Sequence, residues 1–152
     1  MRLTQSTDFA LRLLMYVARH DGRLVTIAEV ARVHALSEAH LMKITHQLAQ
    51  AGYLETVRGK GGGMRLARPP ALIRLGAVVR DLEPDFALVE CFAGANGCTL
   101  SGDCRLAGVI DDALRAFLAH LDRHTLADLL PPPPGRVAPP ARRAHPASGT
   151  PT

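Results

Sequence analysis

The sequence lacks any long uninterrupted hydrophobic run. No apolar segment approaches the ~18–20 residues that a membrane-spanning helix needs, so we expect no membrane partner. Asp8, Arg12 and Tyr16 interrupt the first twenty residues and no small-residue cleavage site follows, so this stretch is expected to be an amphipathic helix and not a signal peptide. We therefore expect a cytoplasmic protein of one domain, with or without an appendage.

Cysteine is absent everywhere except one short stretch, which holds Cys91, Cys98 and Cys104. An odd number of clustered cysteines in a reducing cytosol argues against structural disulfides. The spacing Cys-x6-Cys-x5-Cys also lacks the close C-x2-C pair that zinc ribbons and redox motifs use. Thiolates are the usual ligands of iron–sulfur clusters, which usually need four ligands. The spacing alone favours such a cluster but leaves a zinc ion and free thiols open.

Acidic residues are scarce in the first half of the chain. Residues 1–80 carry twelve Lys/Arg against five Asp/Glu, whereas residues 81–130 carry three against nine. This division predicts an anion-binding module joined to a separate platform. Residues 131–152 contain no acid and almost nothing to bury, so we expect a disordered tail rich in Pro, Ala and Arg.

Hydrophobic periodicity in the basic half predicts a helix-turn-helix. Thr26, with Glu29 completing a capping box, is expected to begin a helix over residues 27–34. Ser37 is the expected N-cap of a second helix over residues 38–50. Two short helices joined by a tight turn are typical of this motif.

A wing is expected to follow the helix-turn-helix. Gly52 is placed to end the second helix in a left-handed cap, and residues 53–68 read as two strands around the turn sequence RGKGGG. With a first amphipathic helix over residues 5–20, the expected fold is mainly α with a small β-hairpin. We assign residues 1–82 to a winged helix-turn-helix DNA-binding domain.

Side chains of the second helix and the wing have the chemistry for contacts with double-stranded DNA. Those opposite the apolar stripe of the helix suit base edges in the major groove, and wing cations suit phosphates or the minor groove. The candidate DNA-binding residues are Ser37, Ala39, His40, Lys43, His46, Gln50, Arg58, Lys60 and Arg65. The glycines of the wing lack the spacing of a phosphate-binding loop, which disfavours a nucleotide site. We find no acid–base pair or second redox centre, and do not expect an enzyme.

The acidic half predicts a partner for the chain. A helix is expected before Pro84, and residues 105–122 give the longest apolar stripe of this half. A long apolar helix outside a small winged-helix core is economically covered by a second copy, which places two DNA-binding units on half-sites ~10 base pairs or a multiple apart. Residues 83–130 are therefore expected to form a cluster-binding loop and a dimerisation helix. Thr125 and Asp128 are expected to cap a last short helix.

Several stretches in combination resemble the Rrf2 family of winged-helix regulators, and within it the repressors that sense nitric oxide. They include LTQSTDFALR, MKITHQLAQAGYL, VRGKGGGMRL, IRLGAVVRDLEP and the three cysteines ending in CRL, and they cover nearly all of residues 1–130. The resemblance implies a homodimeric repressor with an iron–sulfur cluster held by Cys91, Cys98 and Cys104. It also implies that the repressor leaves its operator when nitric oxide attacks the cluster.

The resemblance extends to the fourth ligand. Another branch of the family has a histidine ligand three residues after the third cysteine, where this chain has Ala107. Asp8 matches the aspartate of the nitric-oxide-sensing branch and would be donated by the partner subunit. The alternative for Asp8 is a favourable interaction with the dipole of its own helix. Glu90 and Asp103 are further candidate ligands, and the donors suit either a [4Fe–4S] or a [2Fe–2S] cluster. A regulator sensing iron, cluster status or thiol oxidation is the alternative function.

Overall fold

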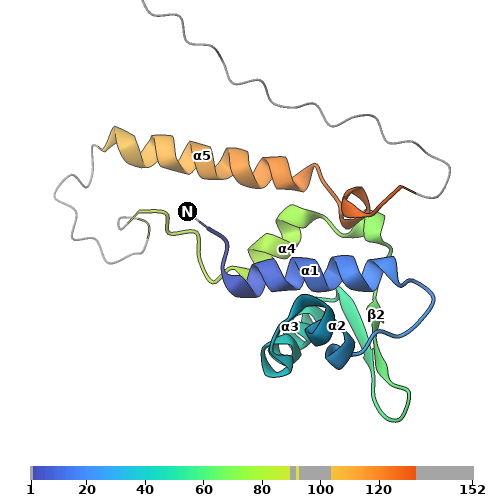
Figure 1. Ribbon diagram of the computed structural model, residues 1–152. Coiled ribbons are helices and arrows are strands. Elements are labelled where there is room, and N and C mark those ends of the chain that lie inside the picture. Colours follow the sequence, from blue (N-terminus) through green and yellow to red (C-terminus); the bar gives the residue numbers. More distant parts are fainter. Residues whose placement is uncertain (1, 90–91, 93–103, 133–152) are drawn as a thin grey trace, which may run out of the picture.

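The computed structural model describes residues 2–89, 92 and 104–132, and the remainder of the chain, including the tail, lies outside this part. In this part the elements in chain order are α1 (Gln5–Arg19), α2 (Ile27–His34), α3 (Glu38–Gln50), β1 (Leu54–Val57), β2 (Gly63–Leu66), η1 (Pro70–Leu72), α4 (Leu75–Leu82), α5 (Arg105–Asp122) and η3 (Leu126–Leu129). Helix α1 lies in the middle of the molecule, with α2, α3 and the hairpin on one side and α4 and α5 on the other (Figure 1).

The predicted starts of the two helices of the motif are confirmed, with two differences in their caps. The Thr26 hydroxyl accepts a hydrogen bond from the Glu29 amide at 3.2 Å, as predicted for α2. The Glu29 carboxylate, however, accepts hydrogen bonds from Tyr16 and Arg23, which lie outside this cap. Ser37 occupies the N-cap position of α3, as predicted, but makes no capping bond through its side chain.

Left-handed residues stand at both ends of the recognition helix α3. Ala35, in the turn before it, has a φ of 53°, and the following Leu36 amide donates to the Ala31 carbonyl at 2.9 Å. Gly52, after α3, has a φ of 75° and ends the helix as predicted. Since only glycine adopts this conformation without a steric penalty, the alanine turn is the more strained of the two.

The wing is a two-stranded antiparallel sheet with an additional contact that the sequence did not predict. A Cβ atom at Gly62 would lie 2.3 Å from the Val57 carbonyl oxygen, so the tip closes only with glycine there. Val25, in the linker before α2, exchanges hydrogen bonds of 2.9 and 2.8 Å with Met64 of β2. The wing is thereby attached along its inner edge to the start of the helix-turn-helix.

One hydrophobic core holds these elements together. Its fully buried large side chains come from five helices and strands (α1, α2, α3, β2 and α4), from η3, and from the short segments before α2 and α4. They are Leu13, Leu14, Val25, Val30, Leu41, Ile44, Leu48, Met64, Ile73, Val78, Val79 and Leu126. Burial of each contributes about 1.5–3 kcal/mol relative to exposure, which makes this core the main stabilising term. No helix in the described part has both the length and the apolar character to cross a membrane.

Helix α4 is packed tightly against the end of α5. A Cβ atom at Gly76 would lie 2.1 Å from Oδ1 of Asp122, so the glycine permits the close approach. Arg80 then binds the same carboxylate with both guanidinium nitrogens, at 2.7 and 2.6 Å. This ion pair lowers the pKa of Asp122.

The two halves of α5 differ in their packing. Of its apolar stripe only Leu114 is buried, whereas Leu106 and Val109 are 62% and 65% exposed. Beyond α5 the chain returns to the core at η3, where Leu126 is buried and its amide donates to the Ile73 carbonyl at 2.8 Å. The predicted capping box of Thr125 with Asp128 is present, although the turn it begins is a 3-10 helix. The N-terminal half of α5 thus extends beyond α4 (Figure 1).

Candidate nucleic-acid interface and cysteine stretch

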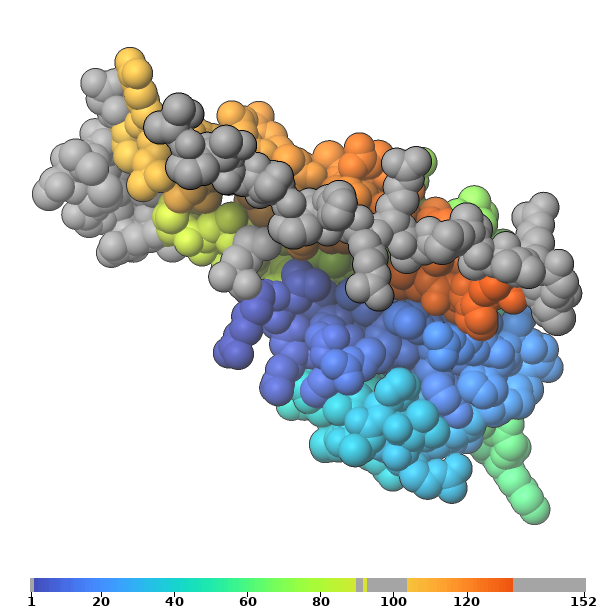
Figure 2. Space-filling view, turned by 45° about the horizontal axis from the view of Figure 1, so that its top comes forward, coloured from blue at the N-terminus to red at the C-terminus, as the bar shows by residue number. Residues whose placement is uncertain are grey.

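The outward face of α3 and the tip of the wing project on the side of the molecule away from α5 (Figure 2). In the space-filling view the cyan surface comes from the helix-turn-helix, and the green wing tip extends beside it. Most of the predicted residues of this helix and its cap are exposed there: Ser37, Ala39, Lys43, His46 and Gln50. Their periodicity places them opposite the buried Leu41, Ile44 and Leu48, as the sequence predicted.

His40 is the one predicted residue of α3 that is half-buried. Its Nε2 lies 3.3 Å from the Ser6 hydroxyl, and its ring packs edge-on against Phe9 at 5.4 Å between centroids. Both partners belong to α1. The side chain is therefore directed toward α1, beside a groove of about 450 Å³ that Lys43 and Gln47 also line.

Besides Glu38, two further exposed side chains of α3 were not among the predicted contacts. Met42 is 57% exposed, and Gln47 is exposed one turn after Lys43. From sequence alone, a methionine beside the buried stripe is expected to belong to the hydrophobic core. An exposed apolar side chain on a recognition helix can instead contact the methyl group of thymine. The i, i+4 relation to Lys43 is the signal that identifies Gln47.

The three predicted cations of the wing differ in their surroundings. Arg58 and Lys60 are exposed in the turn between the strands. Arg65, on β2, instead faces Glu55 across the hairpin and donates two hydrogen bonds to its carboxylate, at 3.0 and 3.1 Å. The guanidinium lowers the pKa of Glu55. Arg58 and Lys60 are consequently the wing cations best placed to neutralise phosphates.

A buried tyrosine joins the recognition helix, the wing and α4. Arg68 caps the end of α3 by donating to the carbonyls of Gly52 and Ala51, both at 3.0 Å. Its guanidinium lies 4.7 Å from the centre of the Tyr53 ring, and the Tyr53 hydroxyl donates to Asp81 of α4 at 2.6 Å. Burial and this hydrogen bond raise the pKa of Tyr53, so the hydroxyl stays protonated as a donor.

The structure describes two of the four predicted cluster ligands. Cys104 is a free, partly exposed thiol at the N-cap of α5, and Cys91 and Cys98 lie outside the described residues. Asp8 lies in the first turn of α1 with 46% of its side chain exposed, and Arg12 binds its carboxylate at 2.8 Å. The described residues contain no group of three or more His, Cys, Asp or Glu side chains placed to hold a metal ion. Glu90 and Asp103 also lie outside the described part.

The described donors fit an iron–sulfur cluster in their chemistry. Cysteine sulfur is the usual ligand of iron–sulfur clusters, and Cys104 is partly exposed at the N-cap of α5. The Asp8 carboxylate is accessible from outside its own chain, as a ligand donated to a partner subunit must be. Both residues are thus available to a shared centre.

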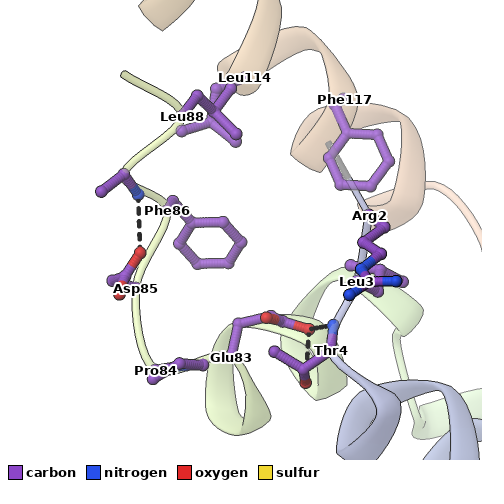
Figure 3. A pocket seen from close by; sticks show the side chains of 11 residues that line it. Arg2, Leu3, Thr4, Glu83, Pro84, Asp85, Phe86, Leu88, Leu114 and Phe117 are labelled. Carbon is purple, nitrogen blue, oxygen red and sulfur yellow. Dashed lines mark hydrogen bonds between the residues drawn. The ribbon is translucent and has the colours of Figure 1, made fainter. Parts of the chain in front are cut away.

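A cavity of about 390 Å³ lies where the segment leading to Cys91 passes between α1 and α5 (Figure 3). Phe86 and Leu88 of this segment line it together with Leu114 and Phe117 of α5. At its base Glu83 accepts hydrogen bonds from the amide and hydroxyl of Thr4, at 2.9 and 3.2 Å. The start of α1, the end of α4 and α5 therefore meet around this segment.

A winged helix-turn-helix that exposes its recognition helix and wing on one face defines a DNA-binding transcriptional regulator. Comparison with known proteins agrees with this class: the model of the Rrf2 family, described as an iron-dependent transcriptional regulator, matches residues 3–132. The chain belongs to the Rrf2 family. The resemblance drawn from the sequence is confirmed.

The relatives are regulators of transcription and not enzymes. The HTH-type transcriptional regulator NsrR of Bacillus subtilis is 47% identical over 132 residues, which cover 86% of this chain and 90% of that protein. NsrR of Geobacillus kaustophilus is 48% identical with the same coverage. Among solved structures, T. potens IscR has a TM-score of 0.68 at 26% identity and 85% coverage of both chains. CymR, the global cysteine regulator of B. subtilis, has a TM-score of 0.65 at 26% identity and covers 85% and 95%. The predicted fold class is confirmed.

Proposed function

We propose that the protein is an iron–sulfur repressor that senses nitric oxide and releases its operator when the cluster is attacked. The observation that carries this proposal is the presence of Asp8 and the three-cysteine stretch in a chain 47% identical to an NsrR regulator. The family description as iron-dependent supports the choice of metal. The exposed recognition helix and wing support operator DNA as the partner.

Cys91, Cys98 and Cys104 would hold the cluster, with Asp8 of the partner subunit as the fourth ligand. When bound, the cluster would present one iron held by a carboxylate and the others held by thiolates. Since a hard oxygen ligand suits this soft environment poorly, the carboxylate would be the ligand most easily displaced. Asp8 is bound by Arg12 in the described chain, and because a carboxylate has about four lone-pair sites, it can accept from the guanidinium and still bind iron. Either a [4Fe–4S] or a [2Fe–2S] cluster is consistent with these donors.

We propose that the protein acts as a homodimer through α5. The exposed Leu106 and Val109 lie on the half of α5 that no described part of the chain covers, and a second copy would bury them. In this arrangement residues 1–82 form the DNA-binding domain and residues 83–130 form the cluster and dimer platform. A fixed spacing between two recognition helices then matches two half-sites of an operator.

The test is anaerobic purification followed by titration with nitric oxide, with visible absorption and operator binding recorded on the same samples. We expect charge-transfer absorption at ~400 nm from thiolate-bound iron, and we expect this absorption to bleach as operator binding is lost. Asp8→Ala should alter the absorption and the response to nitric oxide, whereas Asp21→Ala, at an exposed residue after α1, should leave both unchanged. An Asp8→Ala dimer with an unaltered spectrum and response would remove Asp8 as a ligand.

The alternative is an Rrf2 regulator that senses iron, cluster status or thiol oxidation. It is supported by the family description and by similarity to CymR, a cysteine regulator. This alternative predicts that operator binding follows iron supply or thiol oxidant and is indifferent to nitric oxide. Colourless protein that contains zinc or no metal would favour the thiol-based form.

A further inference from the structure

The last turn of α4 makes side-chain hydrogen bonds to two separate parts of the molecule. Asp81 accepts from the Tyr53 hydroxyl at 2.6 Å, and Tyr53 is the residue that begins the wing. Two positions later, Glu83 accepts from the amide and hydroxyl of Thr4 at 2.9 and 3.2 Å, at the start of α1. The chain then passes through the segment that leads to Cys91. The turn therefore lies between the cysteine stretch and the winged helix-turn-helix.

The Tyr53 hydrogen bond reaches both DNA-contacting elements. Tyr53 follows Gly52, the residue that ends α3, and its ring carries the guanidinium of Arg68 at 4.7 Å. Arg68 in turn binds the carbonyls of Ala51 and Gly52, the two residues that follow α3. Tyr53 is 3% exposed, and the hydrogen bond of its hydroxyl within the described residues is the one to Asp81, so a shift of Asp81 moves the acceptor of this hydroxyl.

Helix α5 contacts both ends of α4. Gly76 allows Asp122 of α5 to lie against the first turn of α4, and Arg80, in the last turn next to Asp81, binds the same carboxylate. Cys104 stands at the other end of α5. A displacement of the cysteine stretch can therefore reach the last turn of α4 through α5 and Arg80, and through the chain that follows Glu83.

We propose that the last turn of α4 couples the state of the cysteine stretch to operator affinity, with Tyr53 and Asp81 as positioning residues. The inference rests on the proposed function. When the turn moves with the cysteine stretch, the acceptor for the Tyr53 hydroxyl moves, and the Arg68 cap that orients the end of α3 and the wing moves with it. The strength of a hydrogen bond depends on its distance and angle, so this bond responds to such a shift. An apolar contact at the same place has no such directional dependence.

The test compares operator affinity of cluster-loaded and cluster-free protein at one salt concentration. The wild-type ratio of the two dissociation constants is expected within the ~5–150-fold range of allosteric coupling. Tyr53→Phe removes only the hydroxyl, and we expect the ratio of the two dissociation constants to fall by about fivefold or more. If the wild-type ratio is itself below about five, we expect the variant to have a ratio of one. Asp81→Ala should behave in the same way. Asp81→Asn keeps a carbonyl acceptor, and we expect it to retain the wild-type ratio.

The matched control is Tyr16→Phe. It removes a hydrogen bond of similar length, 2.7 Å, between Tyr16 and Glu29, which joins α1 to α2 without touching α4. We expect it to lower the stability of the protein as much as Tyr53→Phe does but to keep the wild-type affinity ratio. As a readout that does not need the cluster, amide hydrogen exchange of residues 54–66 in the cluster-free protein should be faster in Tyr53→Phe alone.

The outcomes separate the inference from the proposed function. An unchanged ratio in Tyr53→Phe, or an equal loss in Tyr16→Phe, would overturn the coupling role and leave a structural hydrogen bond. Equal operator affinity with and without the cluster in the wild-type protein would instead contradict the proposed function, and the coupling with it. Circular dichroism of each variant verifies that the comparison is made on folded protein.

Discussion

Glu29 is the most connected carboxylate among the described residues. It accepts hydrogen bonds from Arg23 at 2.9 Å and from the Tyr16 hydroxyl at 2.7 Å, and its own amide is held by Thr26. The Arg23 guanidinium and the tyrosine hydroxyl lower the pKa of Glu29 to about 2. The side chain thus joins α1, the linker after it and the start of the helix-turn-helix.

This depressed pKa predicts how stability depends on acidity. Its contribution is fully present above the ordinary pKa of 4.5 and is lost as the pH falls toward about 2, because protonation then favours the unfolded chain. Glu29→Gln should be less stable than wild type at neutral pH, and the difference in urea midpoint should shrink progressively below about pH 4.5. Glu38→Gln, at an exposed position of α3, is the control. A difference that stays constant down to pH 2.5 would contradict this assignment.

Among the elements, the close contact between α4 and α5 depends on a single glycine. Gly76→Ala would bring a Cβ atom within 2.1 Å of Oδ1 and 3.0 Å of the amide nitrogen of Asp122. The Asp122 side chain must leave its ion pair with Arg80 or the helices must separate, and we expect a loss of about 1–3 kcal/mol in the free energy of unfolding.

Gly108→Ala is the matched control for that substitution. It lies inside α5, where a Cβ atom would have nothing within 4 Å. Alanine is preferred over glycine within a helix, so this variant should gain about 0.5–1 kcal/mol. Urea denaturation at one protein concentration measures both variants, and changes of equal sign would show that the glycine contact does not matter.

The exposed half of α5 predicts the oligomeric state. The double variant Leu106→Glu, Val109→Glu replaces one exposed leucine and one exposed valine. Burial of each by a partner would contribute about 1.5–3 kcal/mol. We expect the double variant to sediment as a monomer at concentrations where the wild type is a dimer. Leu72→Glu, at a residue 65% exposed on η1, should leave the dimer intact. A double variant that remains dimeric would place the interface elsewhere.

The helices and the hairpin were predictable because their signals are local. The apolar period of 105–122, the left-handed Gly52 and the glycine-rich turn depend on neighbours within one or two turns, and the structure has these features where expected. The partners of individual side chains were not predictable in this way. Glu29 pairs with Arg23 and Tyr16, Arg65 with Glu55, and Val25 with Met64, and each choice follows from how distant segments are packed.

The candidate site was predictable to the same extent. The exposed positions of α3 follow from helical periodicity, and the cysteine positions follow from composition alone. That His40 faces α1, whereas Met42 faces solvent, depends on where α1 crosses the recognition helix. Periodicity along one helix contains no information about that crossing.

For the molecule as a whole, residues 1–80 are basic and residues 81–130 are acidic, and DNA binding is expected to depend on salt. Arg58→Ala and Lys60→Ala should each weaken binding about equally to specific and unrelated DNA, and each should reduce the slope of log affinity against log salt by about one. Arg115→Ala, on the exposed surface of α5, should leave the slope unchanged. Filter binding or fluorescence anisotropy across a salt series measures the slope, and wing variants with the wild-type slope would place the phosphate contacts on other residues.

Helix α5 is anchored at its C-terminal end, so a small rotation there moves its N-terminal end over a larger distance. Its C-terminal end is held by Gly76, Arg80 and the buried Leu126, whereas Cys104 stands at the other end of the helix. A helix of 18 residues is about 27 Å long, so a rotation of only about 5° at the anchored end carries Cys104 through about 2 Å. Conversely, a displacement of that size at the thiol is reduced to a few degrees of tilt against α4. In the proposed sensor, a small change in bonding at Cys104 would therefore change the angle between α5 and α4.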